Sequence, residues 1–156
     1  MPPSVFLCAA ALTAILVHAA WGDVRTRQIP NWIPAAIALI APFWWWASGV
    51  PSWSALGWQV GVAVVLALLL FAAWTRGMIG GGDVKLLAAL ALWFAPLPLL
   101  QLLTVMAIAG GGVTVLALIE HRVRRRPGPP EVPYGVAIAF AGLWAMTNEF
   151  LTSSVQ

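Results

Sequence analysis

Long uncharged stretches dominate the chain. Residues 1–22, 28–75 and 86–119 contain no Asp, Glu, Lys or Arg. A helix needs about 20 apolar residues to cross a bilayer, and turn-forming residues at 48–52 and 95–98 divide the two longer stretches. The pattern predicts an all-α membrane protein with one membrane-embedded domain, residues 1–156. Its six expected transmembrane helices are about 3–22, 30–47, 54–75, 82–95, 98–119 and 133–151.

Composition supports a membrane protein. Of the 156 residues, 62% are hydrophobic and 8% are charged, whereas a soluble domain carries about 25% charged residues. A helical bundle in water would need a polar face on each helix, and the sequence offers none. The net charge of +3 fits membrane topology better than a nucleic-acid partner. Because Cys8 is the single cysteine, an internal disulfide or a multi-cysteine metal site is excluded, and we expect no metal or cofactor.

The basic residues predict the orientation. All eight Lys and Arg residues fall in the first, third and fifth connections between the predicted helices or, for Lys85, in the first turn after the third connection. Basic residues accumulate in cytoplasmic loops, so these connections are expected in the cytoplasm and both termini outside it. Tryptophan favours the membrane interface, and six tryptophans are expected at or near the outer edge as anchors: Trp44, Trp45, Trp46, Trp53, Trp58 and Trp93.

Two aspartates lie at helix ends on the cytoplasmic side. Asp23 ends the first predicted helix, and Asp83 opens the fourth after three glycines, residues 80–82. Acidic side chains beside a membrane are costly and usually functional. We therefore expect the first and fourth helices to bring the two carboxyls together. Two simpler interpretations remain open: Asp83 caps its helix, and Asp23 pairs with Arg25 or Arg27.

The fourth predicted helix is short. From Asp83 to Ala95 it would be about 20 Å long at 1.5 Å per residue, too short for a full bilayer core. Either the membrane is thinner there, or the glycines at 80–82 dip below the surface. Glycine permits strained dihedrals and close approach of the backbone to a ligand. We therefore expect a water-accessible pocket around Asp83.

Three segments together resemble the type IV prepilin peptidases, in particular the short form found with tight-adherence (Flp-type) pili. They are Asp23 with Ile29-Pro30-Asn31, then Gly80-Gly81-Gly82-Asp83-Val84-Lys85-Leu86, then Val132-Pro133-Tyr134-Gly135-Val136-Ala137-Ile138-Ala139. The resemblance extends from the first predicted helix to the last. It implies the architecture of a GxGD-type intramembrane aspartyl protease in a bacterial inner membrane.

The resemblance also implies roles for residues. Asp23 and Asp83 correspond to the catalytic pair, and the partner is a pilin-like precursor whose basic leader is cleaved at the cytoplasmic face. Other motif positions are expected to support the site: Gly80, Gly81, Gly82, Lys85, Pro133, Tyr134 and Gly135. For Lys85 and the 133–135 turn, a helix-start cation and a helix-opening turn are equally good interpretations.

One departure narrows the expected activity. Longer relatives carry a cytoplasmic insertion with paired cysteines, associated with N-methylation of the cleaved pilin. This chain has no room for that insertion and only one cysteine, Cys8. We therefore expect peptidase activity without methylation.

The chemistry of an aspartate pair needs one ionised and one protonated carboxyl around a water, which neighbouring carboxyls favour by sharing a proton. A helix N-terminus favours negative charge, so Asp83 is expected as the base and Asp23 as the acid. Two alternatives for the whole chain remain: a small carrier using the aspartates as a proton relay, or an inactive pilus or secretion assembly factor. Neither internal repeats nor charges near the membrane midplane, which carriers commonly show, are evident in the sequence.

Overall fold

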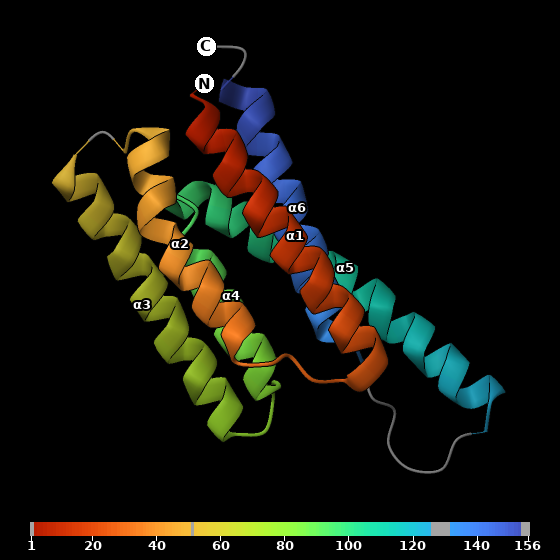
Figure 1. Cartoon of the computed structure of the whole chain (residues 1–156). Coiled ribbons are helices and arrows are strands. Elements are labelled where there is room, and N and C mark those ends of the chain that lie inside the picture. The colour runs from red at the N-terminus through yellow and green to blue at the C-terminus, as the bar shows by residue number, and fades with distance from the viewer. Residues whose placement is uncertain (1, 51, 126–131, 154–156) are drawn as a thin grey trace.

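Six helices make up the described part of the fold. The computed structural model describes residues 2–50, 52–125 and 132–153, and contains no strand within them. The helices are α1 (Pro3–Thr26), α2 (Trp32–Ser48), α3 (Trp53–Thr75), α4 (Gly81–Ala91), α5 (Pro96–Val123) and α6 (Tyr134–Ser153) (Figure 1). The predicted all-α class is confirmed.

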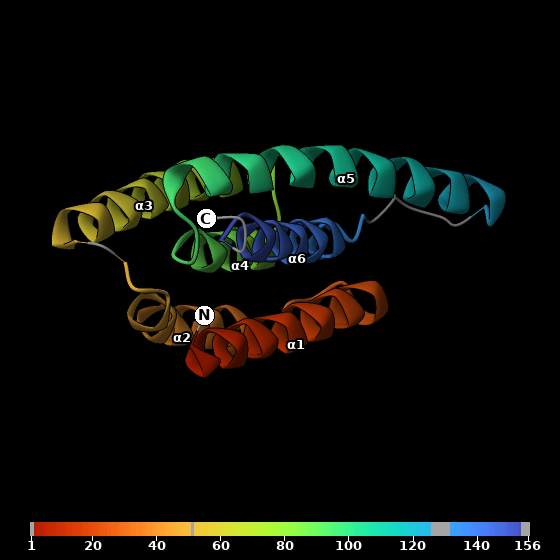
Figure 2. The ribbon, with the colours of Figure 1, turned by 90° about the horizontal axis from the view of Figure 1, so that it is seen from above.

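The helices form three layers. Seen from above, α4 and α6 lie between a layer of α1 and α2 and a layer of α3 and α5 (Figure 2). The contacts agree, because α4 packs on α2, α3 and α6, and α6 packs on α1, α4 and α5. The fully buried side chains Leu16, Ile37, Leu90 and Ile138 come from α1, α2, α4 and α6. The middle layer is therefore covered on both faces.

The outer surface is apolar. Helices α1, α3 and α5 are each long and apolar enough to cross a membrane, at 24, 23 and 28 residues. Along α3 only Gln59 and Ala63 are buried, so its large side chains, such as Leu68 and Phe71, lie exposed. Such a surface suits lipid rather than water, and the chain is a polytopic membrane protein, as predicted.

The six helices follow the predicted order with shifted ends. Helix α1 continues to Thr26 rather than ending at residue 22, so Asp23 lies inside its last turns. Helix α5 begins at Pro96, where a residue without an N–H is tolerated. Helix α4 has only 11 residues, fewer than the 82–95 segment predicted. It cannot cross a bilayer core alone, and its C-terminus ends against other helices.

Side chains from α2 and α3 donate hydrogen bonds to the backbone carbonyls where α4 ends. The carbonyl oxygen of Leu92 accepts hydrogen bonds from Gln59 Nε2 at 2.8 Å and from Trp45 Nε1 at 2.7 Å. The carbonyl oxygen of Trp93 accepts one from Trp44 Nε1 at 3.0 Å. The last carbonyls of a helix lack partners within it, and water is scarce at membrane depth. These three donors therefore allow α4 to stop inside the protein.

The expectation that Trp44 and Trp93 anchor the outer edge is wrong. They are 4% and 1% exposed, and their rings stack with centroids 5.4 Å apart. The physical reason is that both indole N–H groups have partners in the interior: Trp44 Nε1 donates to the Trp93 carbonyl oxygen beyond the end of α4, and Trp93 Nε1 donates to the Ile37 carbonyl oxygen of α2 at 2.9 Å. The sequence pattern alone does not distinguish a buried donor from an interfacial one.

Replacing Trp44 with Phe tests this capping. The variant keeps an aromatic ring but leaves the Trp93 carbonyl without a donor, which should cost about 1–3 kcal/mol of unfolding free energy. Unfolding measured in detergent micelles should show the loss. The control is Trp46→Phe, at a position 75% exposed, and equal stability of the two variants would contradict the capping role.

Candidate active site

Both predicted aspartates line one cavity. It has a volume of about 340 Å³ and lies between the end of α1, the following loop and the start of α4. Its lining residues are Asp23, Arg27, Gln28, Ile29, Gly80, Gly81, Gly82 and Asp83. Helices α1 and α4 both pack on α2 and α6, so they face each other diagonally. The Asp83 carboxyl lies close enough to Asp23 to be affected by its charge.

Gly80 makes room for the Asp83 carboxyl. Gly80 is the extended residue before α4, and a Cβ there would lie 2.8 Å from Asp83 Oδ2. Asp83 belongs to the first turn of α4, where the helix dipole favours a carboxylate. A side chain at residue 80 would therefore push the Asp83 carboxyl out of its position.

The next two glycines allow close packing rather than strain. A Cβ on Gly81 would lie 3.1 Å from Trp74 Nε1, and one on Gly82 would lie 3.1 Å from Ile29 Cβ. None of residues 80–82 has a positive φ, and the glycine of this connection that does is Gly77, at 70°. Absence of a side chain, not a left-handed backbone, is what the triplet provides.

Asp23 is buried between α1 and α6. Asp23 is 6% exposed, and a Cβ on Gly135 would lie 2.8 Å from Asp23 Oδ2. The backbone amides of Gly135 and Val136, in the first turn of α6, face the carboxyl. Among the described residues, Oδ2 makes no hydrogen bond of good geometry, so we regard these amides as nearby donors rather than formed bonds.

The N-terminus of α6 beside Asp23 changes the expectation of which aspartate is protonated. The expectation that Asp23 is the acid used only its place near the C-terminus of α1. In the fold, Asp23 also faces the N-terminus of α6, while Asp83 lies at the N-terminus of α4. Both carboxyls therefore lie at helix N-termini, and the dipole of α1 alone does not decide which one is ionised.

Arg27 is a cavity residue that the sequence interpretation treated only as a neighbouring cation. It caps α1 with a left-handed backbone, φ 54° and ψ 27°, and its N–H donates to the Asp23 carbonyl oxygen at 3.0 Å. Its Nη1 atom is buried, without a hydrogen bond in the described part of the chain. The usable sequence signal was its place four residues after Asp23, at the end of the same helix.

Lys85 lies away from the cavity. Its side chain is exposed, and Nζ donates to Asn31 Oδ1 at 2.8 Å. This bond joins the first turn of α4 to the start of α2. Lys85 therefore holds two helix ends together and does not reach the aspartates.

The residues at the turn into α6 have two different roles. Gly135 contacts Asp23, whereas Tyr134 packs against α5, since a Cβ on Gly110 would lie 2.8 Å from Tyr134 Cε1. The Pro133 carbonyl oxygen accepts the Val136 N–H at 3.2 Å and so begins the helix. Tyr134 and Pro133 thus orient α6, and Gly135 alone of the three borders the aspartate pair.

The bond between Lys85 and Asn31 predicts a small energetic coupling. Lys85→Met and Asn31→Ala should each lower the unfolding free energy by less than about 1 kcal/mol, because the pair is exposed. The double variant should lose no more than the larger single effect. Unfolding measured for all four proteins tests this, and fully additive losses would contradict the pairing.

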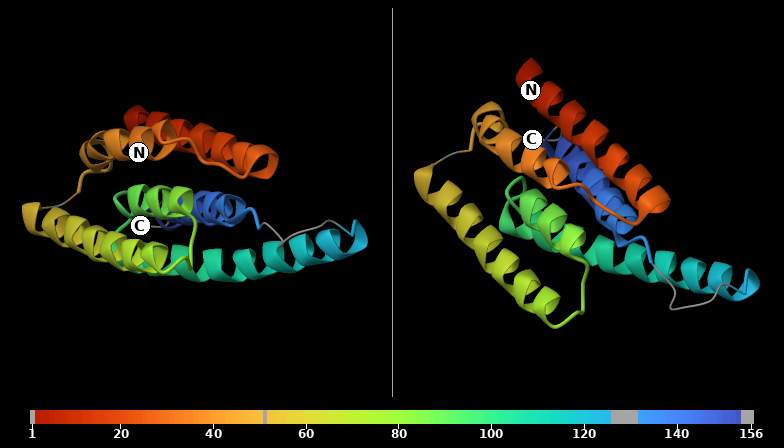
Figure 3. Two further views of the ribbon diagram at one scale, coloured as in Figure 1. Left: turned by 90° about the horizontal axis from the view of Figure 1, so that it is seen from below. Right: turned by 60° about the horizontal axis from the view of Figure 1, so that its bottom comes forward.

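An apolar groove runs beside Asp23. It has a volume of about 350 Å³ and is lined by Leu16, Val17, Ala20, Trp21, Val24, Val136, Ala139, Phe140 and Leu143. Helices α1 and α6 lie side by side along it (Figure 3). Val24 and Val136 come directly after Asp23 and Gly135 in the chain, so the groove reaches the helix turns that carry Asp23 and Gly135, although it shares no lining residue with the aspartate cavity.

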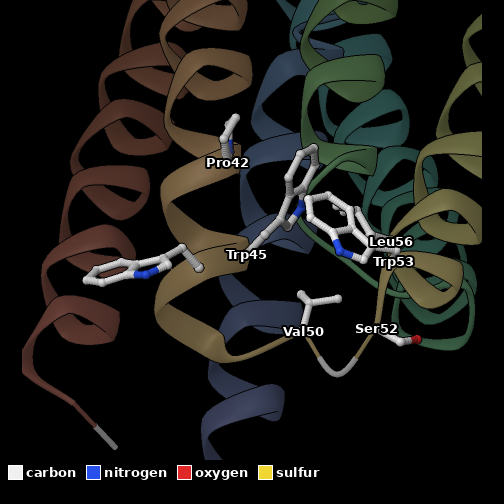
Figure 4. A pocket seen from close by; sticks show the side chains of 7 residues that line it. Pro42, Trp45, Val50, Ser52, Trp53 and Leu56 are labelled. Atoms are coloured by element: carbon white, nitrogen blue, oxygen red, sulfur yellow. The ribbon is translucent and has the colours of Figure 1, made fainter.

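A larger cavity lies between the end of α2 and the start of α3, away from the aspartate cavity (Figure 4). Its volume is about 600 Å³, and its lining residues are Pro42, Trp45, Trp46, Val50, Ser52, Trp53 and Leu56. The Ser52 hydroxyl is bonded to Ser54 at 2.9 Å and caps α3. None of the described residues that line this cavity is acidic or basic, so they do not offer the chemistry of the aspartate site. In the described ranges, no three His, Cys, Asp or Glu residues gather as a metal site would require.

Comparison with known proteins identifies the family. The sequence model of the type IV leader peptidase family matches residues 10–115, a range that includes both aspartates, and the chain belongs to this family. The chain is 29% identical over 160 residues to prepilin leader peptidase/N-methyltransferases of Burkholderia pseudomallei strains 1026b and K96243. Each alignment covers 96% of this chain and 50% of the relative, so the chain spans about half the length of these curated relatives. No solved structure matches the chain.

Proposed function

We propose that this chain is an aspartic endopeptidase that removes the basic leader peptide from type IV prepilin-like proteins. Asp23 and Asp83 are the proposed catalytic pair. The observation that carries the proposal is the cavity that both aspartates line. Gly80 in this cavity leaves room for the Asp83 carboxyl, and Gly135 on α6 leaves room for the Asp23 carboxyl. Membership of the type IV leader peptidase family supports the same activity.

In the proposed reaction, the two carboxyls share one proton and hold a water between them. The ionised carboxyl takes a proton from the water as its oxygen attacks the scissile carbonyl carbon. The protonated carboxyl gives its proton to the carbonyl oxygen, forming a neutral gem-diol. The C–N bond then breaks, the leaving nitrogen takes a proton from the carboxyl that accepted one, and the other carboxyl recovers its proton from the gem-diol. No proton or electron is left over, and the pair is ready for another water.

The surroundings of the cavity fit such a substrate. The apolar groove along α1 and α6 would hold the apolar helix of the precursor, with the scissile bond beside Asp23. The cavity lies at the end of the molecule where the basic connections after α1 and α3 are found. By the positive-inside rule this end faces the cytoplasm, which supports an enzyme of the bacterial inner membrane with its termini outside.

Cleavage by the purified chain tests the proposal. The protein in detergent or liposomes is incubated with a candidate precursor carrying a basic leader and an apolar helix. Mass spectrometry of the product should show a new N-terminus at a single bond. A folded protein that leaves every candidate precursor intact would instead favour a proton-relay carrier or an inactive assembly factor.

A further inference from the structure

The cavity contains a cation whose donor has no partner. Arg27 lines it with both aspartates, and Nη1 is buried without a hydrogen bond within the described residues. Asp23 Oδ2 is likewise buried without one. Buried polar atoms normally have partners, so an unbonded donor on a cation that lines this cavity beside the aspartates indicates that a polar group binds there.

Arg27 does not satisfy Asp23 directly. The two side chains are close enough to interact through their charges, but in the described part of the chain the pair within 4 Å of each other is Arg124 and Glu120, not Arg27 and Asp23. The guanidinium therefore stands apart from the carboxylate. The gap leaves space for an atom that accepts a hydrogen bond from Arg27.

The backbone at Arg27 also points to a use for its side chain. Its φ of 54° is disfavoured for a residue with a Cβ, and glycine is the usual residue at this position after a helix. An arginine here bears that conformational cost and places its guanidinium in the cavity. Such strain at a non-glycine residue is typical of functional sites.

We propose that Arg27 binds the carbonyl oxygen of the scissile peptide bond and stabilises the negative charge that develops on it. This inference rests on the proposed peptidase function. A carbonyl oxygen has two lone pairs, so it can accept from Arg27 and from the protonated aspartate together. An aspartate pair with one shared proton carries one negative charge, which Arg27 balances. A neutral peptide group therefore fits the cavity better than a further carboxylate.

Arg27→Gly separates binding from folding. Glycine suits the left-handed backbone, so the unfolding temperature should stay the same or rise. The kcat/KM for precursor cleavage should fall at least about tenfold, as for loss of an oxyanion donor. Arg27→Lys should restore only part of it, because ammonium lacks the planar fork. The control is Arg25→Gln, which removes an exposed cation from the same helix end and should cleave normally.

Binding to an uncleavable analogue identifies the contacted atom. In Asp83→Asn protein, Arg27→Gly should weaken binding of the precursor about tenfold, the effect of losing one hydrogen bond from a charged group. It should not weaken binding of an analogue with an (E)-alkene in place of the scissile bond, which has no carbonyl oxygen. If the loss of precursor binding disappears once acidic side chains of the precursor are replaced, a carboxylate is the ligand and the carbonyl proposal is overturned.

Comparing the activities of Asp23→Asn and Arg27→Gly separates this inference from the proposed function. Inactive Asp23→Asn with fully active Arg27→Gly would overturn the role of Arg27 alone. Active Asp23→Asn would overturn the proposed peptidase site and the Arg27 inference with it.

Discussion

Replacing either Asp23 or Asp83 by Asn is expected to abolish leader cleavage. Each change keeps the shape of the side chain but removes a group that must take up or give a proton, so kcat/KM should fall by at least about 1,000-fold. Among the described residues that line the cavity, no other side chain is acidic and could substitute. Cleavage of a precursor by each purified variant, followed by mass spectrometry, measures the loss.

If Asp23 and Asp83 act as one unit, the activity losses of their single variants should not add. The double variant Asp23→Asn/Asp83→Asn should be no less active than either single variant, because each single change already removes the shared mechanism. Glu120→Gln is the control, since it removes an acid from an exposed salt bridge with Arg124 on α5. It should cleave normally. Either aspartate variant keeping near-normal activity, while folded, would contradict the catalytic pair.

Much of the fold was predictable because its signals are local. Charges and prolines divide the chain into six segments, and the structure has six helices in the same order. The short fourth segment was evident from the distance between Asp83 and Ala95. What remained unpredictable was how a short helix is satisfied at its end, because Gln59, Trp44 and Trp45 reach α4 from other parts of the chain.

The site was predicted less completely than the fold. The sequence placed Asp23 and Asp83 at one end of the molecule, and the structure puts them on one cavity. It did not indicate that Asp23 faces the start of α6, because that contact joins residues far apart in the sequence. Arg27 was considered only as an ion-pair partner of Asp23, since the left-handed backbone that ends α1 at this arginine could not be predicted from the sequence. The family motifs contain both Gly135 and Lys85, but only the tertiary contacts show that Gly135 lies against Asp23 whereas Lys85 lies away from the site.

Gly135 should be nearly as sensitive as the aspartates themselves. A Cβ there would lie 2.8 Å from Asp23 Oδ2 and 2.9 Å from Ile29 Cδ1. Neither neighbour can retreat easily, because Asp23 is buried in α1 and Ile29 also fills the space beside Gly82. Gly135→Ala must therefore turn the Asp23 carboxyl away or push α6 outward.

A displacement of about 1 Å at a catalytic group can cost about 100-fold in rate, and we expect a loss of that size in kcat/KM for Gly135→Ala. The matched control is Gly142→Ala on the same helix, where a Cβ would lie 2.9 Å from Leu16 Cδ1. That overlap is equally close but lies in the apolar core, so it should lower the unfolding free energy by about 1–3 kcal/mol and leave the folded enzyme active. Cleavage and unfolding measured for both variants separate the two effects. If Gly135→Ala and Gly142→Ala lose activity only in proportion to lost folding, Gly135 does not position Asp23, and its contact with the carboxyl has no part in the chemistry.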